Sequence, residues 1–141
     1  MIKIYTDGSC LGNPGNGGWA AIINDQDKIT KISGNKKNTT NNQMELIAAI
    51  EALKKIPKGQ EVQIYTDSKY VKIGITEWIK KWSQNNWKTS SKKKVKNISL
   101  WKKLNEISKI HNIEWYWIKA HAGYPLNEEV DKLAKNAASL S

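Results

Sequence analysis

The chain of 141 residues has no arginine and only one cysteine, Cys10. A single cysteine allows no internal disulfide and excludes a cysteine-rich zinc cluster. This composition fits a reducing compartment, and we expect a cytoplasmic location. Cys10 could act as a nucleophile with one of the two histidines, but its place in a glycine-rich turn favours an ordinary small side chain.

The sequence also lacks any long apolar stretch. Its longest apolar runs, Trp19–Ile23 and Leu46–Ile50, have five residues each, whereas a membrane-spanning helix needs about 20. The first residues show neither the basic nor the apolar segment of a secretory signal peptide. We therefore expect no membrane span and no signal peptide. A length of 141 residues is typical of one domain, and we expect a single domain over residues 1–141.

Positive charge is present in excess. All 23 basic residues are lysine, and with 13 acidic residues they give a formal net charge of +10. Such an excess indicates a polyanionic partner, most simply a nucleic acid. An A/T-rich genome would also favour lysine over arginine, but it would not explain the surplus of positive charge.

Four residues near the start of the chain, Ile4–Asp7, recur unchanged at Ile64–Asp67. Ile, Tyr and Thr favour strands, and the residues that follow favour turns, so each copy predicts a strand with an aspartate at its carboxyl end. If the two strands are parallel neighbours, both carboxylates lie on one side of the sheet and can share a cation. The alternative is a pair of solvated aspartates at strand ends.

The periodicity of the remaining segments predicts an α/β fold. A helix expected over Asn42–Ile56 supplies the crossover that a parallel neighbour of the first strand requires. The expected strands are Ile2–Thr6, Gly18–Asn24, Lys28–Ser33, Glu61–Asp67 and Ile113–Lys119, and the first three form an antiparallel meander. The other expected helices are Ser68–Trp82 with a kink near Gly74, Ile98–Ile110 and Asn127–Leu140. The connector Gly8–Gly18 is either a glycine-rich hairpin or backbone left free to approach a ligand.

Glu45 interrupts the apolar side of the helix expected over Asn42–Ile56. A carboxylate that points toward a core is costly unless a cation or hydrogen-bond donors meet it. One explanation is a capping box in which Asn42 is the N-cap and Glu45 reaches back to it. The other explanation is a metal ligand, and the helix pattern alone does not decide between them.

The stretch from Trp78 to Asn105 contains nine lysines and four of the seven tryptophans but no acidic residue. Part of it has the spacing of a packed helix, so Trp78 and Trp101 could be core residues above a solvated lysine face. A solvated face usually mixes both signs of charge, however. We therefore favour a basic hairpin that binds phosphates and offers aromatic surfaces to sugars or bases.

Two further polar residues lie near the end of the chain. His121 follows the last expected strand, beside Gly123, and Asp131 borders the apolar side of the last expected helix. Each of them alone is more often structural than catalytic. With Asp7, Glu45 and Asp67 they would make four carboxylates and one imidazole.

Five segments resemble the motifs of bacterial type 1 ribonuclease H: Tyr5–Gly15, Thr40–Leu46, Tyr65–Val71, Trp87–Thr89 and His121–Asp131. The resemblance covers essentially the whole chain, in the family's order and spacing. It implies a five-stranded mixed sheet of order 3-2-1-4-5, flanked by helices, with a basic protrusion at about residues 80–96. It also implies an endonuclease that hydrolyses the RNA strand of RNA–DNA hybrids and leaves 5′-phosphate and 3′-hydroxyl ends.

The resemblance implies that four carboxylates bind two Mg²⁺ ions, which Mn²⁺ can replace: Asp7, Glu45, Asp67 and Asp131. It also implies that His121 is a mobile residue that assists proton transfer or product release. Carboxylate oxygens suit these ions, and two ions about 3.5–4 Å apart can activate water and stabilise the leaving oxygen. The implied partner is an RNA–DNA hybrid. We expect a monomer with no obligate protein partner.

Contacts with both strands of the hybrid are implied as well. The RNA strand, with its 2′-hydroxyls, is expected at Cys10, Gly12, Asn13, Asn41 and Gln43, and a DNA phosphate is expected at Thr40 and Asn13. The basic protrusion and the DNA channel are expected to use Trp78, Lys92, Lys93, Lys94, Lys96 and Trp101.

Three residues depart from the family's pattern. Gln43 stands where relatives often have arginine, Ala120 replaces a glycine before His121, and Leu126 replaces a polar residue. The first departure removes a charge directed at a phosphate, and the other two could alter how freely His121 moves. Two other functions stay open at this point: the nuclease domain of a reverse transcriptase, and a non-catalytic hybrid-binding module of the same fold.

Overall fold

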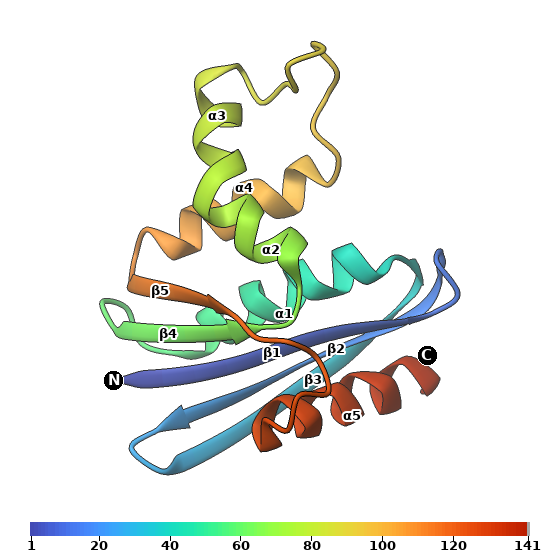
Figure 1. Cartoon of the computed structure of the whole chain (residues 1–141), viewed down its shortest axis with the longest axis vertical. Coiled ribbons are helices and arrows are strands. Elements are labelled where there is room, and N and C mark those ends of the chain that lie inside the picture. The colour runs from blue at the N-terminus through green and yellow to red at the C-terminus, as the bar shows by residue number, and fades with distance from the viewer. Residues whose placement is uncertain (141) are drawn as a thin grey trace.

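The computed structural model, which describes residues 1–140, contains a mixed sheet in the order β3-β2-β1-β4-β5. Three antiparallel strands come first: β1 (Ile2–Leu11), β2 (Gly15–Asp25) and β3 (Lys28–Thr39). β4 (Glu61–Thr66) then pairs with β1, and β5 (Asn112–Trp117) pairs with β4, both in parallel. This topology confirms the expected mixed sheet and its strand order (Figure 1).

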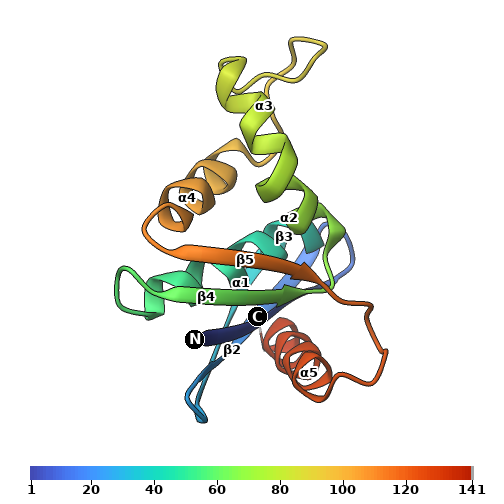
Figure 2. The same ribbon diagram turned by 60° about the vertical axis from the view of Figure 1, so that its left-hand side comes forward.

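Two helices cover the sheet from opposite sides. α1 (Asn41–Lys55) connects β3 to β4, and α5 (Pro125–Ser139) is the last element of the fold. Ile23 of β2 packs in the cluster that holds the buried side of α1, whereas its neighbour Ile22 packs against α5. Because successive side chains of a strand point to opposite faces, the sheet lies between the two helices (Figure 2).

The first strands run further than expected. β1 and β2 stay paired as far as Leu11 and Asn16, so the glycine-rich connector is a hairpin with a short turn, and β3 is extended in the same way. The ladder between β1 and β4, however, stops at Thr6 and Thr66. Asp7 thus lies inside β1 rather than at its end, which corrects the expectation. It is still the first residue of β1 beyond the parallel pairing.

The other elements lie close to their expected positions. The ends of α1, β4, α4 (Ile98–Ser108), β5 and α5 are within two residues of those expected. α5 begins earlier, at Pro125, because a proline fits the first turn of a helix, where its missing N–H is not needed. Within residues 1–140, no helix combines the length and apolarity needed to cross a membrane.

The segment after β4 forms one interrupted helix, made of α2 (Lys69–Ile73), the π-helical turn η1 (Gly74–Trp78) and α3 (Ile79–Gln84). The change of geometry begins at Gly74, where the sequence predicts an irregularity. A Cβ at position 74 would overlap the Trp101 ring. Glycine therefore lets the interrupted helix pack against α4, which carries Trp101.

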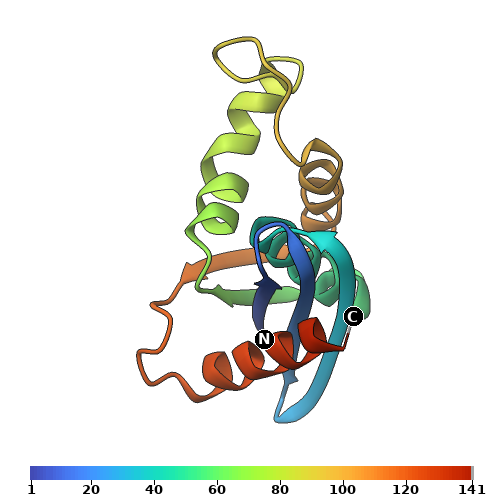
Figure 3. The same ribbon diagram turned by 90° about the vertical axis from the view of Figure 1, so that its right-hand side faces the viewer.

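α3 and the loop that joins it to α4 project from the body of the molecule (Figures 1 and 3). The loop folds back on itself through an antiparallel bridge between Lys88 and Lys94. Val95 is buried in the main core cluster and anchors the returning strand of the loop. The lysines of this loop at positions 92, 93, 94 and 96 are all exposed, as a phosphate-binding surface requires.

Trp101 belongs to the core beneath this projection. Its ring is fully buried and packs against Tyr70, Trp78 and Trp82, and its Nε1 donates a hydrogen bond to Tyr70 Oη at 3.0 Å. A ring without exposed surface cannot stack on a nucleotide. The expectation that Trp101 contacts nucleic acid is therefore wrong for this structure, because the space beside Gly74 receives the ring. Trp78 remains partly exposed.

Candidate active site

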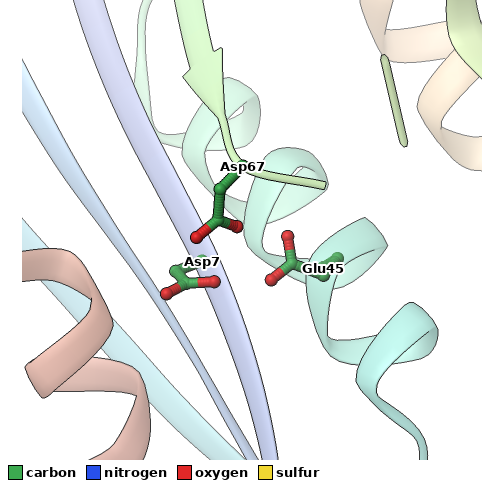
Figure 4. A group of neighbouring side chains, drawn as sticks. All are labelled: Asp7, Glu45 and Asp67. Carbon is green, nitrogen blue, oxygen red and sulfur yellow. The ribbon is translucent and has the colours of Figure 1, made fainter. Parts of the chain in front are cut away.

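Three carboxylates meet where β4 ends (Figure 4). Asp7 comes from β1, Glu45 from α1, and Asp67 from the turn after β4. Each contributes one oxygen to a group in which all three oxygens lie within 4.8 Å of one another. Oxygen ligands so close together, contributed by three separate elements, can hold a divalent cation.

The strand pairing brings the two aspartates together. Thr6 of β1 is the direct partner of Thr66 of β4 in the parallel ladder, so the next residue on each strand is an aspartate at the same level. The repeated Ile-Tyr-Thr-Asp sequence thus places two carboxylates side by side, as its pattern predicts.

Glu45 reaches the aspartates because α1 approaches β1 closely at Gly8. The Gly8 main-chain N–H donates a short hydrogen bond to Glu45 Oε1. A Cβ on residue 8 would lie 2.5 Å from Glu45 N and 2.6 Å from Met44 C, so any other residue would push the helix away. Glycine at this position is a condition for the third carboxylate to join the group.

The N-cap of α1 is Thr40, whose Oγ1 accepts a hydrogen bond from Gln43 N at 3.2 Å. The capping box that would have used Asn42 as the N-cap is therefore wrong, because the helix begins one residue earlier than expected. Glu45 lies in the second turn of the helix, and its partner is Gly8 of the sheet.

The cluster is hard to ionise fully in the absence of a cation. Asp7 and Glu45 are 3% and 7% exposed, and the second oxygen of each, Asp7 Oδ2 and Glu45 Oε2, has no hydrogen-bond partner. Burial, and then the neighbouring Glu45, raises the pKa of Asp7 far above its ordinary range. Burial also raises the pKa of Glu45 and of Asp67. A bound cation would satisfy the unpaired oxygens and lower these pKa values again.

Asp131 of α5 lies beside the group of three but outside it. It interacts with Asp7 and Asp67, and its Oδ2 accepts an ion-pair contact from Lys135 at 3.0 Å. Its side chain is 20% exposed. Burial tends to raise the pKa of Asp131, but its interactions with Asp7 and with the Lys135 ammonium lower that pKa overall. The fourth expected ligand is thus ionised and open to solvent at the rim of the cluster.

His121 lies in the exposed loop between β5 and α5. Its backbone has a φ of 56°, in the left-handed region, and Gly123 two residues later has a φ of 86°. The imidazole is close enough to act electrostatically on both Asp67 and Asp131. The expected histidine is thus exposed and lies within electrostatic range of two of the four carboxylates.

A cavity of about 320 Å³ opens beside the N-terminus of α1. Its lining contains five of the expected nucleic-acid contacts, including Lys96, which was expected in the basic protrusion, and two further residues, Asn42 and Asn97. The seven lining residues are Asn13, Thr40, Asn41, Asn42, Gln43, Lys96 and Asn97. Asn13 Oδ1 accepts a hydrogen bond from Asn41 N, and Gln43 Nε2 donates one to Asn97 Oδ1, both at 3.2 Å. A helix N-terminus, amide groups and one ammonium suit a phosphate.

Asn97 lines this cavity, and its place there was not predicted from the sequence. It precedes α4 and has a φ of 59°, a conformation that asparagine tolerates better than most residues. Its Nδ2 donates to Tyr70 Oη at 3.1 Å, so it connects the cavity to the buried aromatic cluster. Only its position just before a predicted helix could have drawn attention to it.

Cys10 and Gly12 lie in the hairpin between β1 and β2. Cys10 Sγ contacts the carbonyl oxygens of Thr39 at 3.2 Å and Gly15 at 3.5 Å, so the thiol helps to hold the hairpin against β3. Gly12 is exposed and has a φ of 91°, which the tight turn requires. Both residues precede Asn13 in the chain, and Asn13 lines the cavity beside α1.

A second cavity, of about 480 Å³, lies in the projecting part of the molecule. It is lined by Trp78, Lys81, Trp82, Asn85, Lys88, Thr89 and Ser90. Of these, Trp78 was among the expected contacts, and Lys81 and Lys88 belong to the basic protrusion expected at about residues 80–96. Two indole rings and two ammonium groups around one cavity are suited to a nucleic-acid backbone. The four expected lysines of the loop lie outside this lining.

Comparisons with known proteins agree with this fold. The sequence model of the family RNase H matches residues 1–139. A ribonuclease H of Wolbachia sp. subsp. Drosophila simulans (strain wRi) is 57% identical over 136 residues, which is 96% of this chain and 94% of that protein.

Solved structures give the same result. LC9-RNase H1, described as a type 1 RNase H with the type 2 active-site motif, has a TM-score of 0.86 and 32% identity over 98% of this chain and 72% of its own. LC11-RNase H1, crystallised with an RNA/DNA hybrid, has a TM-score of 0.73 and 25% identity, with 100% of both chains covered. The chain therefore belongs to the ribonuclease H family and is a ribonuclease H enzyme of type 1 architecture.

Proposed function

We propose that this enzyme cleaves the RNA strand of RNA–DNA hybrids endonucleolytically, with divalent metal ions held by its clustered carboxylates. The observation that carries the proposal is the group of Asp7, Glu45 and Asp67, in which two buried oxygens have no hydrogen-bond partner. The burial of several ionised carboxylates close to one another is unfavourable unless a positive charge compensates them. The RNA/DNA hybrid found with LC11-RNase H1 supports the substrate class.

The donor set fits Mg²⁺, and Mn²⁺ as a substitute, because both prefer oxygen ligands. Asp7, Glu45 and Asp67 would form the inner part of the site, and Asp131 would complete it from α5. When bound, a pair of such ions supplies an activated water and stabilises the leaving 3′-oxygen, which yields 5′-phosphate and 3′-hydroxyl ends. The four side chains hold the site together from β1, α1, the β4 turn and α5.

His121 would serve the proton steps. Its imidazole lies outside the tight carboxylate group, in an exposed loop, and acts electrostatically on Asp67 and Asp131. From that position it can take a proton from the site to solvent or assist product departure. It needs no metal contact to do so.

The surfaces around the carboxylates suit a double-stranded substrate. The cavity beside α1 would seat a phosphate of the DNA strand at Thr40 and Asn13, with Lys96 as its cation. Short neutral groups near it, including Asn41, would meet the RNA strand and its 2′-hydroxyls. The Gln43 side chain accepts a hydrogen bond from Thr39 Oγ1 at 2.6 Å and donates one to Asn97. Gln43 would therefore also help to shape this cavity.

The projecting part would hold the DNA strand further along. The cavity around Trp78 and Trp82 offers aromatic edges, and the exposed lysines at positions 92, 93 and 94 offer positive charge on the loop above it. These contacts would depend on the positions of the phosphates and on the shape of the duplex, not on the base sequence. They therefore suit an enzyme that acts without a strict sequence requirement.

A substrate panel tests the proposal. Labelled RNA–DNA, RNA–RNA, DNA–DNA and single-stranded RNA are incubated with the protein in Mg²⁺ and, separately, in EDTA. Cleavage of only the RNA strand of the hybrid, and only with metal, is the expected result. Mapping of the product ends then checks for 5′-phosphates. Binding of the hybrid without cleavage under all metal conditions would contradict the proposal and indicate a binding module.

A further inference from the structure

Asp67 is the carboxylate of the cluster with the least regular backbone. Asp7 lies within a paired strand and Glu45 within a helix, whereas Asp67 follows the last paired residue of β4. The turn after it is held locally, since Ser68 N donates to Thr66 Oγ1 at 3.0 Å and Val71 N donates to Ser68 Oγ at 3.2 Å. These hydrogen bonds fix the start of α2, but neither of them involves the main-chain oxygen of Asp67.

That partner is the side chain of Trp117, the last residue of β5. Its Nε1 donates a hydrogen bond to the main-chain oxygen of Asp67 at 2.9 Å. The adjacent ladder bond, from Ile118 N to Thr66 O, is also 2.9 Å. The main-chain hydrogen bonds between β5 and the chain of β4 thus extend to Thr66. The Trp117 side chain adds one more hydrogen bond at the next residue, Asp67.

Core packing does not account for Trp117. Its side chain is among the exposed large hydrophobics, with 39% of the residue accessible. The Lys69 ammonium lies over the indole ring, 4.8 Å from its centroid. The ring is thus oriented by a hydrogen bond at its edge and a cation on its face, and both contacts come from the segment that carries Asp67.

We propose that Trp117 is a positioning residue for metal binding: its indole N–H fixes the main chain from which the Asp67 carboxylate projects, and Lys69 keeps the indole in place. The inference rests on the proposed metal-dependent function. Mg²⁺ demands near-ideal octahedral geometry at about 2.0–2.1 Å, so a small shift of one ligand lowers affinity. The effect should therefore appear in the affinity for the ion, without a matching loss of fold stability.

Trp117→Phe removes the N–H donor and keeps an aromatic ring. The full chain is titrated with Mn²⁺ and followed by electron paramagnetic resonance of the free ion, and with Mg²⁺ by calorimetry. We expect binding to weaken about 3- to 10-fold, the range that the loss of one hydrogen bond brings. Thermal unfolding in EDTA should change little. Tyr116→Phe is the matched control, because it removes a hydroxyl that bonds Glu114 at 2.7 Å on the same strand.

Lys69→Leu tests the second contact, with Lys72→Leu of the same helix as its control. Removal of a nearby positive charge should by itself tighten the binding of a cation. If Lys69 positions the indole, Lys69→Leu should instead bind Mn²⁺ more weakly than Lys72→Leu does. This comparison also decides the proposal if Trp117→Phe does not fold.

The outcomes separate this inference from the function on which it rests. If the wild type binds Mn²⁺ no better than Asp7→Asn, the metal site itself is wrong. If the wild type binds Mn²⁺ well and Trp117→Phe binds it equally well, Trp117 has no positioning role. The same conclusion follows if Lys69→Leu matches or exceeds Lys72→Leu in affinity.

Discussion

The main-chain N–H of Gly8 donates a hydrogen bond to the carboxylate of Glu45, and this contact joins the central strand of the sheet to the crossover helix at the carboxylate cluster. It is possible only because residue 8 has no side chain: a Cβ would lie 2.5 Å from Glu45 N. Gly8 thus allows α1 to pack closely against β1, and this close packing places Glu45 beside the two aspartates.

Gly8→Ala should therefore damage both stability and metal binding. We expect a loss of about 1–3 kcal/mol in the free energy of unfolding, the usual cost of forcing extra volume into a packed region. Mn²⁺ affinity should fall as well, because Glu45 moves away with α1. Urea unfolding and Mn²⁺ titration measure the two effects.

Gly59→Ala is a suitable control for that substitution. Position 59 has a φ of 77° and nothing within 4 Å of an added Cβ, so the variant adds backbone strain without a clash. It should cost about 1–2 kcal/mol and leave Mn²⁺ affinity unchanged. An equal drop in metal affinity in both variants would show that global destabilisation, and not the displacement of Glu45, is responsible.

The metal-free enzyme should lose stability as the pH rises from about 5 to about 8. Burial raises the pKa of Asp7 and of Glu45, so the folded chain keeps protons that an unfolded chain, with carboxyl pKa values near about 4, has already released. Stability falls with rising pH wherever the folded state binds more protons. The lowered pKa of Asp131 acts in the opposite direction only below about pH 4. Thermal unfolding in EDTA across this pH range measures the slope.

Asp7→Asn identifies the group responsible. The variant removes a buried carboxyl, so its metal-free form should unfold at a higher temperature than the wild type at about pH 8, with a flatter pH dependence. Cleavage of the hybrid should become nearly undetectable. Asp25→Asn, at an exposed end of β2, should change neither property. Full cleavage by Asp7→Asn would falsify the metal-site assignment, and a large decrease in metal-free stability would show that Asp7 serves the fold.

The central part of the site could be predicted because short-range rules determine it. Identical strand sequences and a helix of crossover length are enough to place Asp7 and Asp67 as neighbours. For Glu45, periodicity gives the direction of the side chain but not what it meets. The decisive partner, Gly8, lies 37 residues away. Its contact depends on how closely α1 approaches the sheet, which hydrophobic pattern does not specify.

The surroundings of the site were harder to predict for a related reason. Helical spacing was consistent with Trp101 either in the core or on a basic surface, and the answer depends on the space left by Gly74 on another element. Trp117 carries no sequence signal at all. Its indole meets the Asp67 carbonyl only through the register of β4 with β5. Such contacts between distant residues follow from packing, not from local propensity.

His121→Asn should slow turnover and leave the fold intact. Residue 121 has a φ of 56°, which asparagine tolerates better than alanine, so the substitution removes the titratable group without added backbone strain. Turnover should fall by about 10²–10⁴-fold if the histidine transfers a proton, and by less if it only assists release. Hybrid affinity in Ca²⁺ should stay near that of the wild type. An unfolded variant whose remaining native fraction cleaves at the full rate would make the histidine structural.

The exposed lysines of the projecting loop should contribute to hybrid binding through counterion release. Replacement of Lys92, Lys93, Lys94 and Lys96 by Gln should weaken binding and reduce the slope of log Kd against log salt by about 0.7–0.9 for each phosphate that is no longer neutralised. Turnover at saturating substrate should be nearly unchanged, because none of the four belongs to the carboxylate cluster. Lys28, Lys55, Lys58 and Lys109, also exposed, provide a control of equal charge. If both quadruple variants lower the slope equally, net charge and not the loop explains the binding; if neither does, the loop is only a solvated surface.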